Sequence, residues 1–315
     1  MRLEDYLTKV LYDPTDGYYA QSTVVGKTGD FITAPEVSPL FSLCIAQWII
    51  DQWHNAGSPT PINLVELGAG KGTMLATILK SMEQIPHLAN NLKTYILDSS
   101  DHLKAIQHKT LQPYAVTWIS SLNEVSKGYT IILANEFFDA LPIQYYRSDS
   151  TTTSELNIDD NQLVWDTIDS NTFNEGITYK SRLYEQFTQD ISNLLNANAG
   201  IGLIIDYGNM NPGFTLQAIK NHKKVGLFDF IGQADITHHV DFTYLKRLFN
   251  HHAIKTLGPI PQGQFLKELE IENLVHSLSS LPNYRDQLLA VHRLTAPQEM
   301  GDLFKVLAIQ GGSHA

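Results

Sequence analysis

Cysteine is nearly absent from this chain, and basic residues are scarce. The only cysteine, Cys44, excludes an internal disulfide framework and any metal site built from several cysteines. Lysine and arginine total 22 against 33 aspartates and glutamates, which gives a formal net charge of −11. Because binding to phosphates needs a basic face, this balance argues against a nucleic-acid partner and suits a small molecule or a basic protein segment.

Long apolar runs and targeting signals are also missing. No stretch approaches the ~18 successive apolar residues of a membrane span, so we expect no membrane insertion. The first residues, MRLEDYLTKVLYDP, lack both a signal-peptide core and an arginine-rich, acid-poor transit character. We therefore expect a cytoplasmic bacterial protein, with a mature organellar protein as the alternative.

The 315 residues are enough for one large α/β domain with additions, or for two domains. Apolar runs alternate with amphipathic helical patterns, which predicts a doubly wound, mostly parallel α/β sheet of the Rossmann-like class. In such sheets ligands bind at the carboxyl ends of the strands. The predicted strands are 62–67, 93–98, 116–119, 131–134, 202–206, 253–257 and 303–309.

Composition divides the chain further. Residues 1–60 are predicted to form an N-terminal helical cap, with a loop-like stretch at 15–37. The core is assigned to 61–142 and 181–315, with helical additions near 208–295. Residues 143–180, rich in threonine, serine, asparagine and aspartate with alternating apolar pieces, predict an inserted β-hairpin region. Residues 208–240 are expected to be loop-rich, and 264–281 carries a helical pattern.

The first core strand runs into a turn with a distinctive spacing of glycines. Glu66 is followed by Gly68, Gly70 and Gly72, an E-x-G-x-G-x-G pattern. This spacing is neither the G-x-G-x-x-G of dinucleotide folds nor the phosphate-binding loop, which argues against a nicotinamide-dependent oxidoreductase. It is similar to the first motif of S-adenosylmethionine (SAM) methyltransferases. Glycines here let backbone approach a ligand closely, at the start of a helix.

Acidic residues follow the other central strands. Asp98 can accept two ribose hydroxyls, or cap the following helix. Asn135, Glu136 and Asp139 can orient a nitrogen nucleophile or hold a guanidinium, or can simply cap a turn. Asp206 and Tyr207 suggest a site role, with a turn aspartate before glycine as the alternative.

Six sequence blocks follow one another along the chain: GDFITAPEVSPLF at 29–41, VELGAGKGT at 65–73, ANEFFDALP at 134–142, IDYG at 205–208, GQADITHHVDF at 232–242 and MGDLFKVL at 300–307. They resemble the blocks of the MidA-like family, whose mitochondrial members assist the assembly of respiratory complex I. The likeness covers nearly the whole chain. ANEFFDALP together with GDFITAPEVS is highly specific, whereas the glycine motif alone is not.

The resemblance implies SAM as cofactor and ω-nitrogen methylation of an arginine in a complex I subunit. A mature form in the mitochondrial matrix is then the organellar alternative, a homodimer is left open, and a non-catalytic SAM-binding assembly factor is the competing function. The family often has glutamate where this chain has Asp98. By motif match, the implied cofactor turn comprises Glu66, Gly68, Gly70 and Gly72, and the block expected to cover the cofactor includes Asp30, Thr33, Pro35 and Glu36. Asn135, Glu136 and Asp139 match a further block and are the expected catalytic residues, with Asp98 and Asn135 also expected to bind the cofactor.

Two adjacent histidines, His238 and His239, raise the question of a metal site. Neighbouring residues in an extended segment point to opposite faces, so both cannot easily bind one ion, and we expect no metal. His239 is a candidate substrate-side group or general base, with a buried, hydrogen-bonded histidine as the alternative.

Overall fold

A central sheet organises the computed structural model, which describes residues 1–20, 33–168 and 175–312. Its strand order is β14-β15-β9-β4-β1-β2-β3, and the short β13 (Val240–Asp241) pairs with β9 off this path. The pairs from β3 across to β9 are parallel, whereas β15 runs antiparallel to β9 and β14 antiparallel to β15. The predicted fold class is therefore confirmed. The strands are β1 Ile62–Leu67, β2 Leu92–Leu97, β3 Val116–Ile119, β4 Tyr129–Asn135, β9 Ile201–Asn209, β14 Lys255–Pro261 and β15 Phe304–Gln310.

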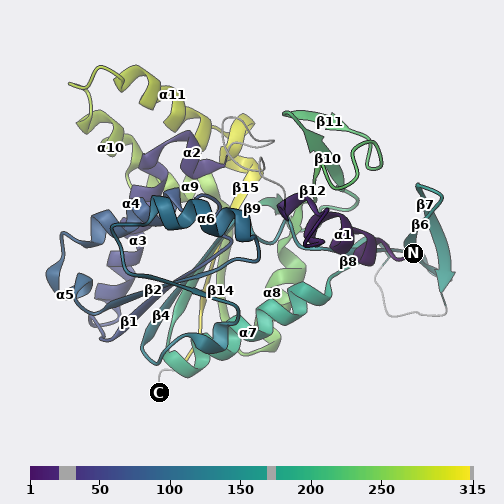
Figure 1. Cartoon of the computed structure of the whole chain (residues 1–315), viewed down its shortest axis with the longest axis horizontal. Helices are drawn as coiled ribbons and strands as arrows, with labels where there is room; N and C mark the ends of the chain where they lie inside the picture. The colour runs from purple at the N-terminus through teal and green to yellow at the C-terminus, as the bar shows by residue number, and fades with distance from the viewer. Residues whose placement is uncertain (21–32, 169–174, 313–315) are drawn as a thin grey trace.

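Helices cover both faces of this sheet, as Figure 1 shows. Successive residues of β1 alternate between two apolar clusters, with Leu64 in one and Val65 in the other, and every residue of the strand is buried. Such burial explains why apolar residues of the strand occur on both of its faces. One cluster includes residues of α3 (Pro39–Asn55) and α4 (Thr73–Met82), and the other includes residues of α7 (Arg182–Asn198) and α8 (Phe242–His251).

Shorter helices connect the parallel strands. After β1 the chain forms α4 and then α5 (Pro86–Ala89), and α6 (Asp101–Thr110) joins β2 to β3. Helix α6 begins at a Ser100 cap, whose side chain accepts a hydrogen bond from the Leu103 N–H. The N-terminal part comprises α1 (Leu3–Tyr12), η1 (Tyr18–Ala20) and α2 (Ala34–Val37).

Two additions extend the core. The described residues of 144–180 form an antiparallel sheet of order β7-β6-β5-β8, which reaches away from the core beside α1 (Figure 1). Its strands are β5 Gln144–Ser148, β6 Thr153–Asp159, β7 Gln162–Ile168 and β8 Gly176–Lys180. The second addition comprises α9 Gln262–Glu268, α10 Ile271–Ser277 and α11 Tyr284–Thr295, followed by η3 Pro297–Gly301. The division into domains stays a prediction.

Two expectations about local structure are wrong. Residues 208–240 are not merely loop-rich, because they contain the sheet β11-β10-β12, formed by Lys223–Val225, Gln217–Lys220 and Asp235–Thr237. These strands are too short for alternation to reveal them. The helical pattern at 264–281 is divided in two, since Glu270 adopts a left-handed φ of 57° between α9 and α10. Among the described residues, none of the helices has the length and apolarity needed to cross a bilayer.

Candidate active site

The glycine turn after β1 depends on backbone conformations that side chains disfavour. Gly68, Gly70 and Gly72 have φ values of 64°, 53° and 79°. A Cβ added at Gly68 would lie 3.0 Å from Cδ2 of Phe137, and one added at Gly72 would lie 3.2 Å from Cδ1 of Leu111. The turn ends where α4 begins, because Gly72 is the residue that precedes that helix. Bare backbone therefore faces the space above the sheet.

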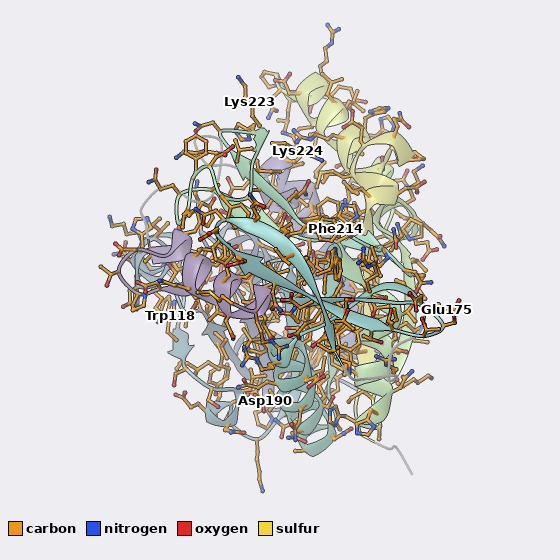
Figure 2. The ribbon with its side chains drawn as sticks, turned by 90° about the vertical axis from the view of Figure 1, so that its right-hand side faces the viewer. Trp118, Glu175, Asp190, Phe214, Lys223 and Lys224 are labelled. Atoms are coloured by element: carbon orange, nitrogen blue, oxygen red, sulfur yellow. The ribbon has the colours of Figure 1, made fainter. Side chains whose placement is uncertain are left out.

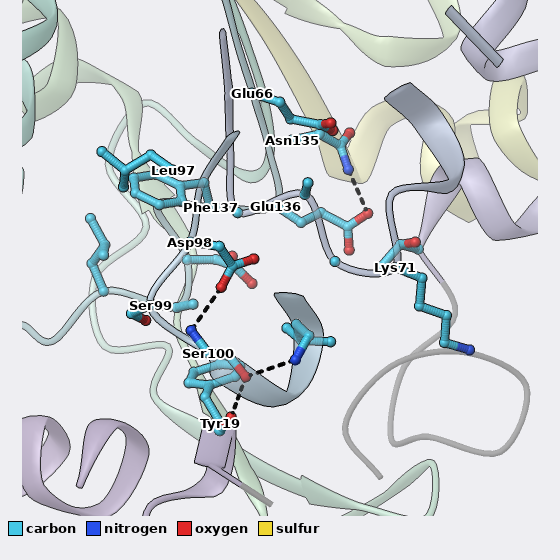
Figure 3. A pocket seen from close by; sticks show the side chains of 18 of the residues that line it. Tyr19, Glu66, Lys71, Leu97, Asp98, Ser99, Ser100, Asn135, Glu136 and Phe137 are labelled. Carbon is cyan, nitrogen blue, oxygen red and sulfur yellow. Dashed lines mark hydrogen bonds between the residues drawn. The ribbon is translucent and has the colours of Figure 1, made fainter. Parts of the chain in front are cut away.

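That space is a cavity of about 320 Å³ at the carboxyl ends of β1, β2 and β4, shown in Figure 3. Small-molecule sites usually measure ~300–1,000 Å³ and occur where parallel strands end. Most of the residues that the sequence singled out line it, whereas Gly72, Asp206 and His239 do not, and Asp30 lies outside the described residues. The predicted residues in the wall are Thr33, Pro35, Glu36, Glu66, Gly68, Gly70, Asp98, Asn135, Glu136, Asp139 and Tyr207.

On the β2 side, Asp98 is held by the protein itself. Its Oδ1 accepts a hydrogen bond from the Ser100 N–H at 2.9 Å, and its Oδ2 accepts one from Gln107 Nε2 at 2.8 Å. Gln107 Nε2 also donates to the Gly70 carbonyl at 2.9 Å, and Gln107 Oε1 accepts from Trp118 Nε1 at 2.8 Å. Burial raises the pKa of Asp98, and these hydrogen bonds oppose that rise. Gln107, which the sequence reasoning missed, thus fixes the carboxylate relative to the glycine turn.

Beyond β4, Glu136 has an unusual backbone. Its φ is 51°, a left-handed value that is rare for a residue with a side chain. Its N–H donates to the Ile205 carbonyl at 2.8 Å. Its Oε1 accepts hydrogen bonds from the Ala34 N–H at 3.2 Å and from Asn135 Nδ2 at 3.3 Å. Burial first, and then the neighbouring Asp139, raise the pKa of Glu136 to about 8.

Asp206 supports this loop from below and does not line the cavity, which corrects its predicted place on the substrate side. Its Oδ2 accepts hydrogen bonds from the N–H groups of Phe138 at 3.0 Å and Asp139 at 3.2 Å. Its Oδ1 accepts one from the Tyr207 N–H at 3.0 Å. This aspartate of β9 therefore shapes the segment that carries Asn135, Glu136 and Asp139.

Four buried oxygens of the cavity residues have no hydrogen-bond partner within the described parts of the chain: Glu66 Oε2, Asn135 Oδ1, Asp139 Oδ1 and the Tyr207 hydroxyl. Burial, together with Asp98, raises the pKa of Glu66 to about 8. Burial raises the pKa of Asp139 to about 7. The Tyr207 hydroxyl opposes that rise, although its geometry falls short of a hydrogen bond. Buried polar atoms are normally paired, so these oxygens are available to a ligand.

The N-terminal segment closes one side of the cavity. Thr73 Oγ1, in the first turn of α4, donates a hydrogen bond to Glu36 Oε1 at 2.8 Å, which ties α2 to the helix after the glycine turn. Tyr12 and Tyr19 also line the cavity, and the sequence reasoning missed both. Tyr19 OH donates to Asp235 Oδ1 at 3.3 Å, so the N-terminal segment also contacts β12.

The two histidines have different environments. His238 is buried, with Nε2 at 3.1 Å from the Tyr184 hydroxyl, and burial lowers its pKa to about 3. His239, the predicted substrate-side group, lies outside the cavity wall with its ring edge-on to Tyr207 at a centroid distance of 5.3 Å. Across the described residues, no group of three or more metal-ligating side chains is arranged to hold an ion.

Comparison with known proteins identifies the family. Residues 44–260 match the family model described as "Putative S-adenosyl-L-methionine-dependent methyltransferase". This chain belongs to that family. Its fold is similar to a crystal structure of a Burkholderia thailandensis protein bound to S-adenosyl-homocysteine, with a TM-score of 0.83 and 26% identity, covering 100% of this chain and 89% of that one.

Curated relatives are similar over nearly the whole chain. The human "Protein arginine methyltransferase NDUFAF7, mitochondrial" is 29% identical, covering 98% of this chain and 81% of the relative. The Drosophila melanogaster homolog is 28% identical with the same two coverages, 98% and 81%. The predicted assignment to the SAM-dependent methyltransferases, with SAM as cofactor, is therefore confirmed.

The cavity suits SAM in its chemistry as well as in its size. SAM carries an ammonium and a sulfonium, so it is a cation that needs oxygen acceptors. Glu66 and Asn135 in the cavity wall each supply an acceptor oxygen that has no hydrogen-bond partner. Gly68 and Gly70 line the cavity without a side chain, and a Cβ added at Gly68 would lie 3.0 Å from Phe137, another residue of the cavity wall.

Proposed function

We propose that this chain transfers the methyl group of SAM to an arginine nitrogen of a protein. The observation that carries the proposal is the acidic corner beyond β4, where Glu136 and Asp139 line the cavity within one loop. A guanidinium is always charged and matches carboxylate pairs through charge-assisted hydrogen bonds. The names of the curated relatives support the same substrate class.

In the proposed arrangement, two sets of residues flank the reacting atoms. The glycine turn, Glu66, Asp98 and Asn135 hold the cofactor, while Glu136 and Asp139 hold the guanidinium. SAM supplies an electrophilic methyl group on a good leaving group, so the protein contributes mainly the positioning of the two reactants. In well-oriented reactions, positioning lowers the activation barrier by an amount on the order of 7–11 kcal/mol.

Glu136 also has a role for the proton in this proposal. Arginine keeps its proton at neutral pH, so the proton leaves the nitrogen during or after transfer. A carboxylate whose pKa is raised to about 8 is a better proton acceptor than an ordinary glutamate. At neutral pH the raised pKa favours the protonated carboxyl in the ligand-free protein. The positive charge of a bound guanidinium lowers that pKa and favours the ionised form, which can accept a proton.

We propose a subunit of respiratory complex I as the partner, because the family resemblance implies it. The net charge of −11 suits an arginine-bearing segment. The mitochondrial location in the relatives' names is theirs, and a bacterial cytoplasmic location stays a prediction for this chain.

Glu136→Gln tests the assignment, because the amide keeps the shape and loses the charge. We expect the methylation rate of a candidate subunit, followed by mass spectrometry, to fall by about 100-fold, within the range seen for acid–base groups. Calorimetric affinity for SAM should stay within about threefold. Glu83→Gln, an exposed glutamate after α4, is the matched control. Unchanged methylation by Glu136→Gln would favour the non-catalytic assembly factor.

A further inference from the structure

The small sheet β11-β10-β12 presents one of its faces to the cavity. Asp235, Ile219 and Lys224 are directly opposite one another across β12, β10 and β11, so their side chains project from the same face. Thr237 and Gln217 form the next row on that face, with Gln217 Nε2 3.5 Å from Thr237 Oγ1. Asp235 and Thr237 line the cavity. We call the five residues Asp235, Thr237, Gln217, Ile219 and Lys224 the rim strip.

The opposite face of this sheet packs on the protein core. Ala218 and Ile236 are each 3% exposed and belong to the large apolar cluster on that side of the central sheet, and Val225 packs against it. The sheet is therefore anchored by one face. The rim strip on the other face continues the cavity wall outward, from buried Asp235 through half-buried Ile219 to exposed Lys224.

Charge changes sign along the rim strip. The cavity end has Asp235 beside Asp139 and Glu136, whereas the outer end has Lys224, in a chain whose net charge is −11. Figure 2 labels Lys224 and its neighbour Lys223 at the β11 end of this sheet. Among the ion pairs of the described residues, Lys224 takes part in none.

The spacing of the rim strip suits an extended peptide. Adjacent strands are ~4.8 Å apart, so two strand spacings separate the rows of Asp235 and Lys224 by roughly 10 Å. An extended chain rises ~3.3 Å per residue, so about three residues cover that distance. A segment whose arginine enters the acidic corner would therefore place a residue about three positions away near Lys224.

We propose that the rim strip binds an extended segment of the protein substrate and that Lys224 selects an acidic residue about three positions from the methylated arginine. This inference rests on the proposed arginine methyltransferase activity and adds a rule of substrate selection to it. Lys224 acts on specificity and takes no part in methyl transfer.

A peptide series tests the inference with the full chain and SAM. Each peptide carries one arginine and one glutamate placed from one to six positions away on either side, with neutral residues elsewhere. We expect kcat/KM to be highest with the glutamate about three positions away on one side. Lys224→Glu should lower kcat/KM for that peptide by about 5- to 10-fold and favour the version with lysine in place of the glutamate, an effect that salt weakens.

Lys223→Glu is the matched control, because Lys223 is also exposed and its substitution makes the same charge change on the opposite face of the sheet. It should leave the positional preference unchanged. Equal rates at all glutamate positions, or equal effects of the two variants, would overturn the rim strip alone. Methylation of none of the arginine peptides, with SAM still bound, would overturn the proposed function and the selection rule with it.

Discussion

Asp206 lies within β9 and Asp139 lies in the loop after the neighbouring strand β4, and the protein uses these two aspartates in different ways. Asp206 is fully buried and accepts three backbone hydrogen bonds, from the N–H groups of Phe138, Asp139 and Tyr207. Asp139 is also buried and leaves Oδ1 without a partner. The first carboxylate holds the loop in place and the second remains available to a ligand, so an acidic residue near the carboxyl edge of the sheet is not by itself evidence of a functional group.

The same contrast separates Asp98 from Glu66 on the other side of the cavity. Asp98 is held by Ser100 and Gln107, whereas Glu66 Oε2 has no partner and its pKa is raised to about 8. Groups that the fold already satisfies define the shape of the site. Polar groups that the fold leaves without a partner are buried at a cost in free energy, which a bound cation would offset.

The most direct test of this difference in roles is to replace the two aspartates separately. Asp206→Ala should lower the free energy of unfolding by about 3 kcal/mol, because three buried N–H groups lose their acceptor. Asp139→Asn should change it by less than about 1 kcal/mol, since the carboxyl is already partly protonated near neutral pH, while the methylation rate falls. Denaturant unfolding and rate measurements on both variants provide the check. Equal losses of stability would contradict the division of roles.

The glycine turn allows a second test of the distinction between residues that define the shape of the site and residues that contact the ligand. Gly70→Val should weaken SAM affinity by about 50-fold, or roughly 2.3 kcal/mol, because the side chain fills the cavity wall at a φ of 53°. Calorimetry measures the loss. Gly57→Val is the control, with a φ of 85° and open space around its Cβ, so it shares the strain without touching the site. An unchanged affinity in Gly70→Val would contradict the placement of the cofactor.

Measured per pH unit, the smallest expected effect is a pH dependence that Glu136 imposes on stability. Its folded pKa of about 8 lies above the ordinary value of 4.5, so between these pH values the unfolded chain has lost a proton that the folded chain keeps. The free energy of unfolding should therefore fall as pH rises through this window, by about 1.4 kcal/mol per pH unit at most, and level off above it. Unfolding of ligand-free Glu136→Gln should lack this component, and identical pH profiles would show that Glu136 titrates normally.

Much of the sheet could be predicted because its strands are apolar on both faces. The predicted strand 62–67 has the same bounds as β1, and the predicted strand 116–119 has those of β3. The predicted strand 253–257 ends before Gly258-Pro259, whereas β14 continues to Pro261 through an irregularity in its pairing with β15. A local sequence pattern does not reveal that pairing with a neighbouring strand lets a strand continue beyond a proline.

The cavity could be predicted only in part. Strand-end acids and the glycine turn follow from a parallel sheet, since the carboxyl ends of its strands share one edge. Gln107, Tyr12 and Tyr19 did not follow, because their contacts join parts of the chain that are distant in sequence. The role of Asp206 was misjudged for the same reason: its three donors become visible only when the loop after β4 is seen folded over β9.

The position of β15 has a consequence for how the protein folds during its synthesis. This strand fills the place between β9 and β14, although it follows both in the chain. During synthesis, therefore, the hydrogen-bonding edge of β9 remains exposed while residues 210–303 are added, and β14 has no strand to join. Such an edge is a template for pairing with other chains, so the nascent protein is vulnerable to aggregation until its last strand arrives.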